Sequence, residues 1–224
     1  MERRLSILIA TIGRRNDSFL ELMASLVPQI ERNNIEVVAY WNTGEKLIGD
    51  LRQALLKEAK GEYICFIDDD DRVPAYYCDE IFFALNSAKE KVDYVGFQVE
   101  LFEKIQGIEH QMPPVFHSIR YGVWHQDEHG YYRGITHLNP IKRELALQAE
   151  FGKNGIGEDE SWARTLMPLV RTEAYINKIM YYYHHDRENT SFGGIERKRK
   201  LYKRPKFEHA QFRWHPKSKE GGIM

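Results

Sequence analysis

Four consecutive aspartates, Asp68 to Asp71, directly follow a short apolar run, Tyr63–Ile67. The aromatic and β-branched residues of that run are typical of a strand buried on both faces. Carboxylates packed this closely repel one another, so a fold that holds them at a buried strand end must neutralise them. An oxygen-preferring divalent cation does so, and substrate phosphates commonly complete the coordination of a cation that one or two carboxylates hold. We therefore expect a Mn²⁺ or Mg²⁺ site here, where open α/β sheets bind ligands, rather than an acidic solvated turn.

A second acidic cluster, Glu158–Asp159–Glu160, opens a helix expected over 158–167 and follows a glycine-rich loop at 152–157. A carboxylate in such a position can accept a proton from an attacking hydroxyl group. The alternative is that the three acids only complement the helix dipole, which is common and worth under about 1 kcal/mol each. The aspartate run upstream favours the proton acceptor.

Two adjacent histidines, His184 and His185, follow a strand expected over 173–183. Neutral imidazole suits manganese as a ligand, so one of them could be a third metal ligand. A lone histidine after a strand is more often a structural hydrogen-bonding group. The sequence leaves open both the role and which of the two would bind.

The elements that must position these residues alternate between strand and helix over the first hundred residues, which predicts βαβ units and a parallel sheet. Pro28 should kink or shorten the first helix, and Gly61 should end the second at its C′ position. The second half is less regular, with short antiparallel strands and loops over 101–130. The expected strands are 5–10, 35–40, 63–67, 92–99 and 131–138, and the further expected helices are 19–31, 46–60, 74–86 and 141–151.

Length and composition bound the protein class. The 224 residues, 42% of them hydrophobic, suit one domain or one domain with a tail. The two cysteines, Cys65 and Cys78, form neither a disulfide framework nor a zinc pattern, so we expect buried thiols in a reducing compartment. Since no apolar run suggests a signal peptide or approaches the roughly 18 residues of a membrane span, we expect a soluble cytoplasmic protein.

Taken in order, these motifs resemble the family 2 glycosyltransferases of the GT-A fold, which use nucleotide-sugar donors. The resemblance covers roughly residues 5 to 190 and extends to the viral or phage type of the family. It implies a single Rossmann-like α/β domain whose central, mainly parallel sheet is flanked by helices. The matching landmarks are Thr11 and Arg14 after the first strand, Asp68 and Asp70 in GEYICFIDDD, the Gly-Glu-Asp motif at Glu158 and Asp159, and the histidine at 184 or 185.

The resemblance implies a metal-dependent, inverting hexosyl- or pentosyltransferase with a nucleotide-sugar donor. Asp70 would ligate the metal, and Asp68 would face the ribose or the metal-bound diphosphate as a further ligand. Asp69 or Asp71 could take either role, because a run of four aspartates leaves the register ambiguous. Of the Glu158–Asp159 catalytic pair, Asp159 would take the proton of the acceptor hydroxyl.

The nucleotide and acceptor contacts also follow from the resemblance. An aspartate usually closes the second strand of this family and helps to hold the base, but here Asn42 or a stacking aromatic stands in that place. This departure leaves the base open, with a UDP-sugar as the expected donor. The remaining expected contacts are Thr11 and Arg14 with the base and the ribose or phosphates, Arg52 with the diphosphate (or on a solvated helix face), and His137 and Asn139 on the acceptor side.

The charges divide the chain into a body, residues 1–195, and a basic tail, residues 196–224. Residues 196–219 hold ten Lys or Arg against two Glu, interleaved with aromatic residues, whereas the body holds 22 basic and 30 acidic residues. Lys and Arg neutralise phosphates and aromatic rings stack on bases, so the acceptor could be DNA carrying a hydroxylated base. Alternatively, the tail touches the donor diphosphate, or it binds anionic lipids near a glycan or lipid-linked glycan acceptor.

Two other protein classes compete with the glycosyltransferase. A nucleotidyltransferase also uses clustered aspartates with metals, but it should carry a glycine-rich phosphate loop, and the segment ATIGRRN is a poor one. A non-catalytic nucleic-acid-binding protein would act through the basic tail alone. The sequence identifies neither the sugar nor the acceptor.

Overall fold

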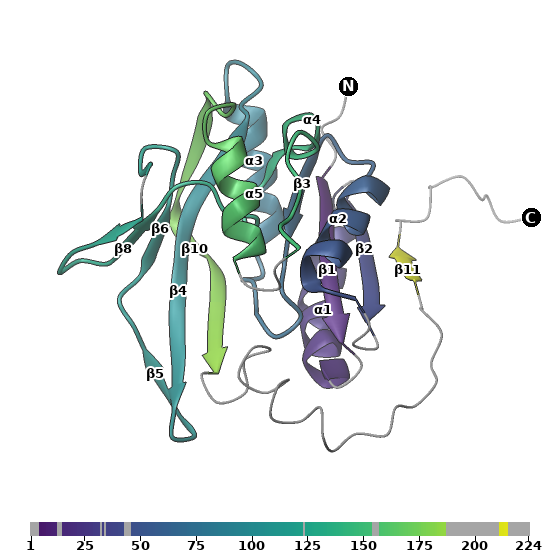
Figure 1. Cartoon of the computed structure of the whole chain (residues 1–224), viewed down its shortest axis with the longest axis vertical. Helices are drawn as coiled ribbons and strands as arrows, with labels where there is room; N and C mark the ends of the chain where they lie inside the picture. Colours follow the sequence, from purple (N-terminus) through teal and green to yellow (C-terminus); the bar gives the residue numbers. More distant parts are fainter. Residues whose placement is uncertain are drawn as a thin grey trace, which may run out of the picture.

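The computed structural model describes residues 5–12, 15–31, 33, 35–42, 46–122, 124–153, 157–186 and 211–214. These residues form one mixed sheet covered by helices (Figure 1). The expected α/β class, with a single domain and a parallel sheet centre, is confirmed. No helix within these ranges is long and apolar enough to span a membrane.

The central strands of the sheet are parallel, and the aspartate run follows one of them. Strand β1 (Leu5–Ile12) pairs in parallel with β2 (Ile35–Asn42) on one side and β3 (Tyr63–Phe66) on the other. All of β3 is buried, because it lies between β1 and β9 with helices on both faces. The connecting helices are α1 (Asn16–Ile30), α2 (Ile48–Glu58) and α3 (Tyr77–Ser87).

The second half of the chain is organised around the long strand β4 (Tyr94–Ile105). Strand β10 (Glu173–Asp186) runs parallel to β4 over most of its length and therefore occupies one side of β4. Shorter strands pair antiparallel with the other side of β4. The remaining elements are β5 (Ile108–Gln111), β6 (Val115–His117), β7 (His125–Gln126), β8 (Tyr131–Arg133), β9 (Ile141–Lys142), α4 (Arg143–Ala146) and α5 (Glu158–Leu166).

Two hydrophobic clusters hold helices to opposite faces of this sheet. Because successive strand side chains point to opposite faces, Ile7 and Ile9 of β1 face α1 and α3, whereas Leu8 faces α2 and α5. Trp162 of α5 is fully buried in the second cluster and stacks on Phe151. This packing anchors α5 on the same face as α2.

Two expected elements of the second half are wrong. Only Tyr131–Arg133 of the expected strand over 131–138 is extended, and the expected helix over 141–151 begins with strand β9 and holds only the four-residue α4. Ile141 pairs with both Ile64 of β3 and Tyr94 of β4. Joining these two strands satisfies backbone groups of the sheet, and this tertiary pairing outweighs the local helix signal.

The local signals at Pro28 and Gly61 have different outcomes. Helix α1 includes Pro28 and ends two residues later at Ile30. The C′ role of Gly61 is wrong, since α2 ends at Glu58 and Gly61 has no positive φ. A Cβ atom at Gly61 would lie 2.6 Å from the Ser6 nitrogen, so close packing against β1 requires glycine there.

Candidate active site

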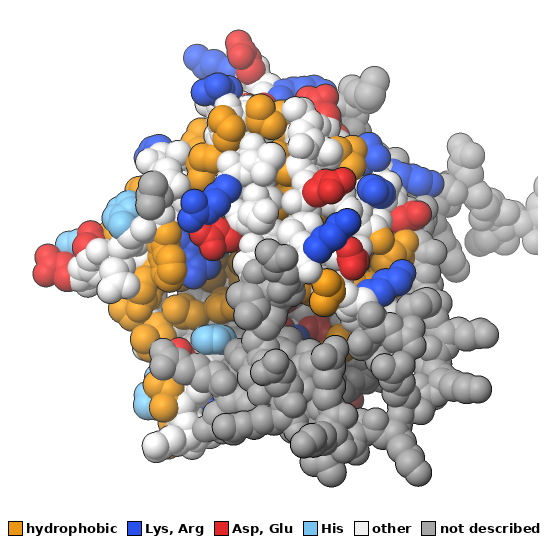
Figure 2. All heavy atoms as spheres, viewed as in Figure 1, with side chains coloured by type: hydrophobic (Ala, Val, Ile, Leu, Met, Phe, Trp, Pro, Cys, Tyr) orange, Lys and Arg blue, Asp and Glu red, His pale blue; other side chains and the backbone are white. Residues whose placement is uncertain are grey.

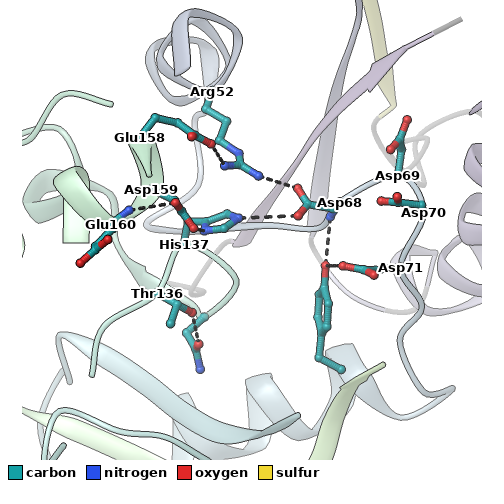
Figure 3. Close-up of polar contacts among 12 residues, drawn as sticks. Arg52, Asp68, Asp69, Asp70, Asp71, Thr136, His137, Glu158, Asp159 and Glu160 are labelled. Atoms are coloured by element: carbon teal, nitrogen blue, oxygen red, sulfur yellow. Dashed lines mark hydrogen bonds and ion pairs between the residues drawn. The ribbon is translucent and has the colours of Figure 1, made fainter. Parts of the chain in front are cut away.

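The four aspartates at the end of β3 point in different directions (Figure 3). Asp69 is buried and turns toward β1, where its carboxylate accepts hydrogen bonds from Thr11 Oγ1 at 2.6 Å and Arg15 Nη1 at 2.8 Å. The contact predicted between Thr11 and the nucleotide therefore competes with a contact inside the protein. Asp69 ties the carboxyl ends of β1 and β3 together.

Asp71 turns the opposite way, toward β10. Its carboxylate accepts hydrogen bonds from the Tyr181 hydroxyl and the His184 backbone N–H, both at 2.8 Å. Burial, together with the charges of Asp68 and Asp70, raises the pKa of Asp71 well above its usual range. A carboxyl group held in this way is suited to joining β10 to the aspartate segment rather than to binding a cation.

Asp68 faces a buried arginine from α2. Arg52 Nη2 lies 2.7 Å from Asp68 Oδ1, and Arg52 Nη1 lies 2.5 Å from Glu158 Oε1. Burial alone would raise the pKa of Asp68, but Arg52 and His137 outweigh it and hold this pKa well below its usual range. Arg52 thus links the end of β3 to the start of α5, where Glu158 lies 106 residues after Arg52 in the sequence.

Asp70 is the most exposed of the four aspartates. Its side chain is 35% exposed and lies 3.0 Å from Arg15 Nη1, which Asp69 already engages. Burial and the neighbouring charges of Asp68 and Asp69 raise the pKa of Asp70 to about 6 in spite of Arg15. A cation at this carboxylate would relieve that repulsion, so the oxygen donors present fit a hard divalent ion.

The second acidic cluster lies across from the aspartate run. Asp159 Oδ2 is 3.4 Å from His137 Nδ1, and Asp68 Oδ2 is 3.9 Å from His137 Nε2 (Figure 3). The Asp159 side chain is 43% exposed, whereas Glu158 is buried against Arg52. The fold therefore brings Asp68, His137 and Asp159 together from three separate segments.

Two glycines allow this approach. Gly157 has a φ of 68°, a left-handed conformation that favours glycine, and begins α5. A Cβ atom at Gly49 would lie only 2.3 Å from the Gly152 carbonyl oxygen. Helix α2 can therefore pack directly against the loop before α5, which places Arg52 within reach of Glu158.

The two predicted histidine ligands face other partners. His184 Nδ1 lies 2.7 Å from Glu109 Oε1 with its ring stacked on Phe102, and His185 Nδ1 lies 3.5 Å from Glu103 Oε1. In the described part of the chain, no group of three or more His, Cys, Asp or Glu side chains is arranged to hold a metal ion. A cation held here by one or two carboxylates would complete its coordination with water or substrate phosphates.

Other predicted site residues serve the scaffold or lie outside the described ranges. Asn139 is fully buried, and its amide bonds to the Val95 carbonyl, Thr136 and His117. Asn42 exchanges hydrogen bonds with the Lys46 backbone. Arg14 lies outside the described residues, as does the basic tail apart from β11 (Gln211–Trp214), which pairs antiparallel with β2.

Sequence reasoning missed two residues of the site, Arg15 and Tyr181. Arg15 follows the predicted Arg14 directly and binds both Asp69 and Asp70. The Tyr181 hydroxyl accepts the Asp68 backbone N–H at 3.0 Å while it donates to Asp71. Its place in the triplet YYY before the two histidines was the available signal, but nothing in the sequence distinguishes it from its neighbours.

The body surface bears on the nucleic-acid hypothesis. On the face shown in Figure 2, basic and acidic side chains are interspersed over α2 and α5. Among the described residues visible there, no continuous basic stripe is present.

Comparison with known proteins supports the fold. No family model and no curated protein matches the sequence. Among solved structures, residues 1–349 of S. aureus TarS match with a TM-score of 0.56 and 15% identity over 81% of this chain. The same protein in complex with UDP gives 0.57 at 14% identity, and in complex with UDP-GlcNAc 0.55 at 14%. The chain spans about 60% of the first two of these structures and 58% of the third. The protein thus has the fold of GT-A glycosyltransferases.

Proposed function

We propose that the protein is a glycosyltransferase that moves a sugar from a nucleoside-diphosphate sugar to an acceptor hydroxyl group. The observation that carries the proposal is the meeting of Asp68 and Asp159 on the two sides of His137. One segment supplies carboxylates suited to a metal-bound diphosphate, and the other a half-exposed carboxylate suited to proton transfer. Glycosyl transfer needs both functions at one place.

On the donor side, Asp70 would hold Mn²⁺ or Mg²⁺, with Asp68 next to it and the donor phosphates completing the coordination. The cation supplies charge neutralisation for the departing nucleoside diphosphate, which lowers the barrier because that charge develops in the transition state. Arg52 keeps Asp68 ionised, as the lowered pKa of this carboxyl group indicates. His184 or His185 would be a third ligand through Nε2, because the Nδ1 atom of each ring already lies next to a glutamate, as is usual for metal-bound imidazoles.

On the acceptor side, Asp159 would act as the general base. The acceptor oxygen attacks the anomeric carbon, the bond from that carbon to the diphosphate oxygen breaks, and Asp159 takes the hydroxyl proton. A single displacement of this kind inverts the configuration of the anomeric carbon. Glu158 is buried against Arg52, so its proposed role is to set the start of α5 rather than to take the proton.

The donor and the domain division complete the proposal. The UDP and UDP-GlcNAc complexes of TarS support a UDP-sugar, with Arg14 and Asn42 near the nucleotide. Residues 1–195 would carry the transfer reaction, and residues 196–224 would form the basic tail. A glycan, a lipid-linked glycan or a hydroxylated base in DNA would each supply the acceptor hydroxyl.

The test is donor hydrolysis and transfer across a panel of nucleotide sugars with and without Mn²⁺. We expect metal-dependent release of one nucleoside diphosphate, lost in Asp70→Ala. Asp159→Asn should keep donor binding by calorimetry but lose about 10²- to 10⁴-fold in transfer, the usual range for removing a general base. Asp50→Asn, an exposed position on α2, is the matched control. Full transfer by Asp159→Asn would refute the assignment of the base.

A further inference from the structure

The imidazole of His137 has an unusual environment that the proposed reaction does not by itself explain. Its side chain is only 7% exposed, and neither ring nitrogen has a hydrogen-bond partner. Buried polar atoms are nearly always hydrogen-bonded, and leaving one unpaired destabilises the fold. An imidazole in this state calls for an explanation outside the packing of the core.

The position of this ring is tightly determined by β3. The His137 carbonyl accepts the Phe66 backbone N–H at 2.9 Å, and the imidazole meets the Phe66 ring edge-to-face with centroids 5.9 Å apart. Two residues later, Asn139 is fixed through its amide to the Val95 carbonyl at 2.9 Å. The backbone of His137 is therefore held to the strand that ends in Asp68.

The ring nitrogens lie between two carboxylates at distances slightly longer than hydrogen bonds. Nδ1 is 3.4 Å from Asp159 Oδ2, and Nε2 is 3.9 Å from Asp68 Oδ2. Shortening the first distance by roughly 0.5 Å would bring it to about 2.9 Å, an ordinary hydrogen-bond length. Asp159 Oδ1 already accepts the Glu160 N–H at 2.9 Å, so a bond from His137 would define the orientation of the whole carboxylate.

We propose that His137 is a positioning residue that donates a hydrogen bond from Nδ1 to Asp159 and so sets the orientation of this base. A movement of the start of α5 toward the ring in the donor complex would bring the Nδ1–Asp159 contact to hydrogen-bond length and orient Asp159 toward the acceptor. The low exposure of the ring places it behind Asp159 rather than against the acceptor, where the sequence had placed it. This inference rests on the proposed function, since it assigns His137 a role in the same reaction.

The kinetic test uses His137→Gln, which retains a hydrogen-bond donor, and His137→Phe, which retains the ring shape. We expect kcat to fall about 10- to 100-fold in His137→Phe and less in His137→Gln, with donor affinity within about 2-fold of wild type. His129→Gln, on an exposed loop, is the matched control. In the Asp159→Asn background, His137→Phe should cause no further loss, because the residue it orients is already absent. Losses that multiply in the double variant would overturn the positioning role.

A spectroscopic measurement separates this inference from the proposed function. In histidine side-chain ¹H–¹⁵N spectra at fixed pH, Asp159→Asn should shift the His137 Nδ1 resonance, whereas Asp50→Asn should not. An unchanged resonance would overturn the contact even in a protein without detected turnover. Wild-type turnover with unchanged kcat in both His137 variants would overturn the positioning role alone. Absence of both turnover and donor binding in the wild type would overturn the proposed function as well.

Discussion

Replacing Asp70 by Asn is expected to stabilise the folded protein at neutral pH while it removes cation-dependent activity. Burial and the charges of Asp68 and Asp69 raise the pKa of Asp70 from 3.8 to about 6. The folded state therefore binds this proton more tightly than the unfolded chain does. Consequently the free energy of unfolding falls as pH rises from about 4 to 6, and the full destabilisation is present above that range.

The expected magnitude follows from this pKa and from the exposure of the side chain. The rise from 3.8 to about 6 corresponds to about 3 kcal/mol at neutral pH. The carboxyl group is 35% exposed, so solvent screening reduces the effect to about 1–2 kcal/mol. Asparagine has nearly the same shape and can still accept a hydrogen bond from Arg15. We expect Asp70→Asn to gain about 1–2 kcal/mol at pH 7.5 and little at pH 4.

The assay is urea unfolding of wild type, Asp70→Asn and the control Asp50→Asn at several pH values between 4 and 8. The difference between wild type and Asp70→Asn should grow through pH 4 to 6, while the control stays level. A second measurement adds Mn²⁺ and UDP, which should raise the melting temperature of the wild type but not of Asp70→Asn. A variant that is no more stable than wild type at pH 7.5, or a difference that does not close in acid, would refute the reasoning.

Two further predictions concern buried charges and titrating groups. Arg52→Met should lower the free energy of unfolding by about 3–5 kcal/mol, because it leaves Glu158 buried without its charge partner. Denaturant titration measures this loss, and adding Glu158→Gln should restore part of it. A loss below about 1 kcal/mol would contradict the pairing. Burial lowers the pKa of His117 from 6.5 to about 3, so the folded protein should lose stability as pH falls from 6.5 toward 3, by at most about 5 kcal/mol. His117→Gln should make the acid limb of the stability curve shallower, and an unchanged limb would show that His117 does not drive the loss.

Much of the α/β framework was predictable because its signals are local. The apolar strands β1, β2 and β3 and the helices between them follow from short-range patterns, and each lies within a few residues of its expected range. The segment 134–151 was not predictable in this way. Its backbone groups are satisfied by β3 and β4, as the pairing of Ile141 with Ile64 and Tyr94 shows.

The candidate site was likewise predictable only where its signals are local. The aspartate run and the acids at the start of α5 could be singled out because carboxylates gathered at a strand end and at a helix start are visible in the sequence alone. The contacts of His184 and His185 depend on side-chain direction, and the Nδ1 atom of each ring lies next to a glutamate of the neighbouring β4–β5 hairpin. Side-chain direction at a strand end is set by neighbouring strands, which no local pattern specifies.

The sequence by itself determined that a buried parallel strand ends in four carboxylates, because strand composition and the position of the aspartates are local properties. Only the tertiary structure decided what each carboxylate does. Asp69 is bound to β1, Asp71 to β10 and Asp68 to Arg52, which leaves Asp70 as the most exposed carboxylate and the one open to a cation. The sequence treats these neighbours as equivalent, and they differ only because partners from distant segments approach each of them from a different direction.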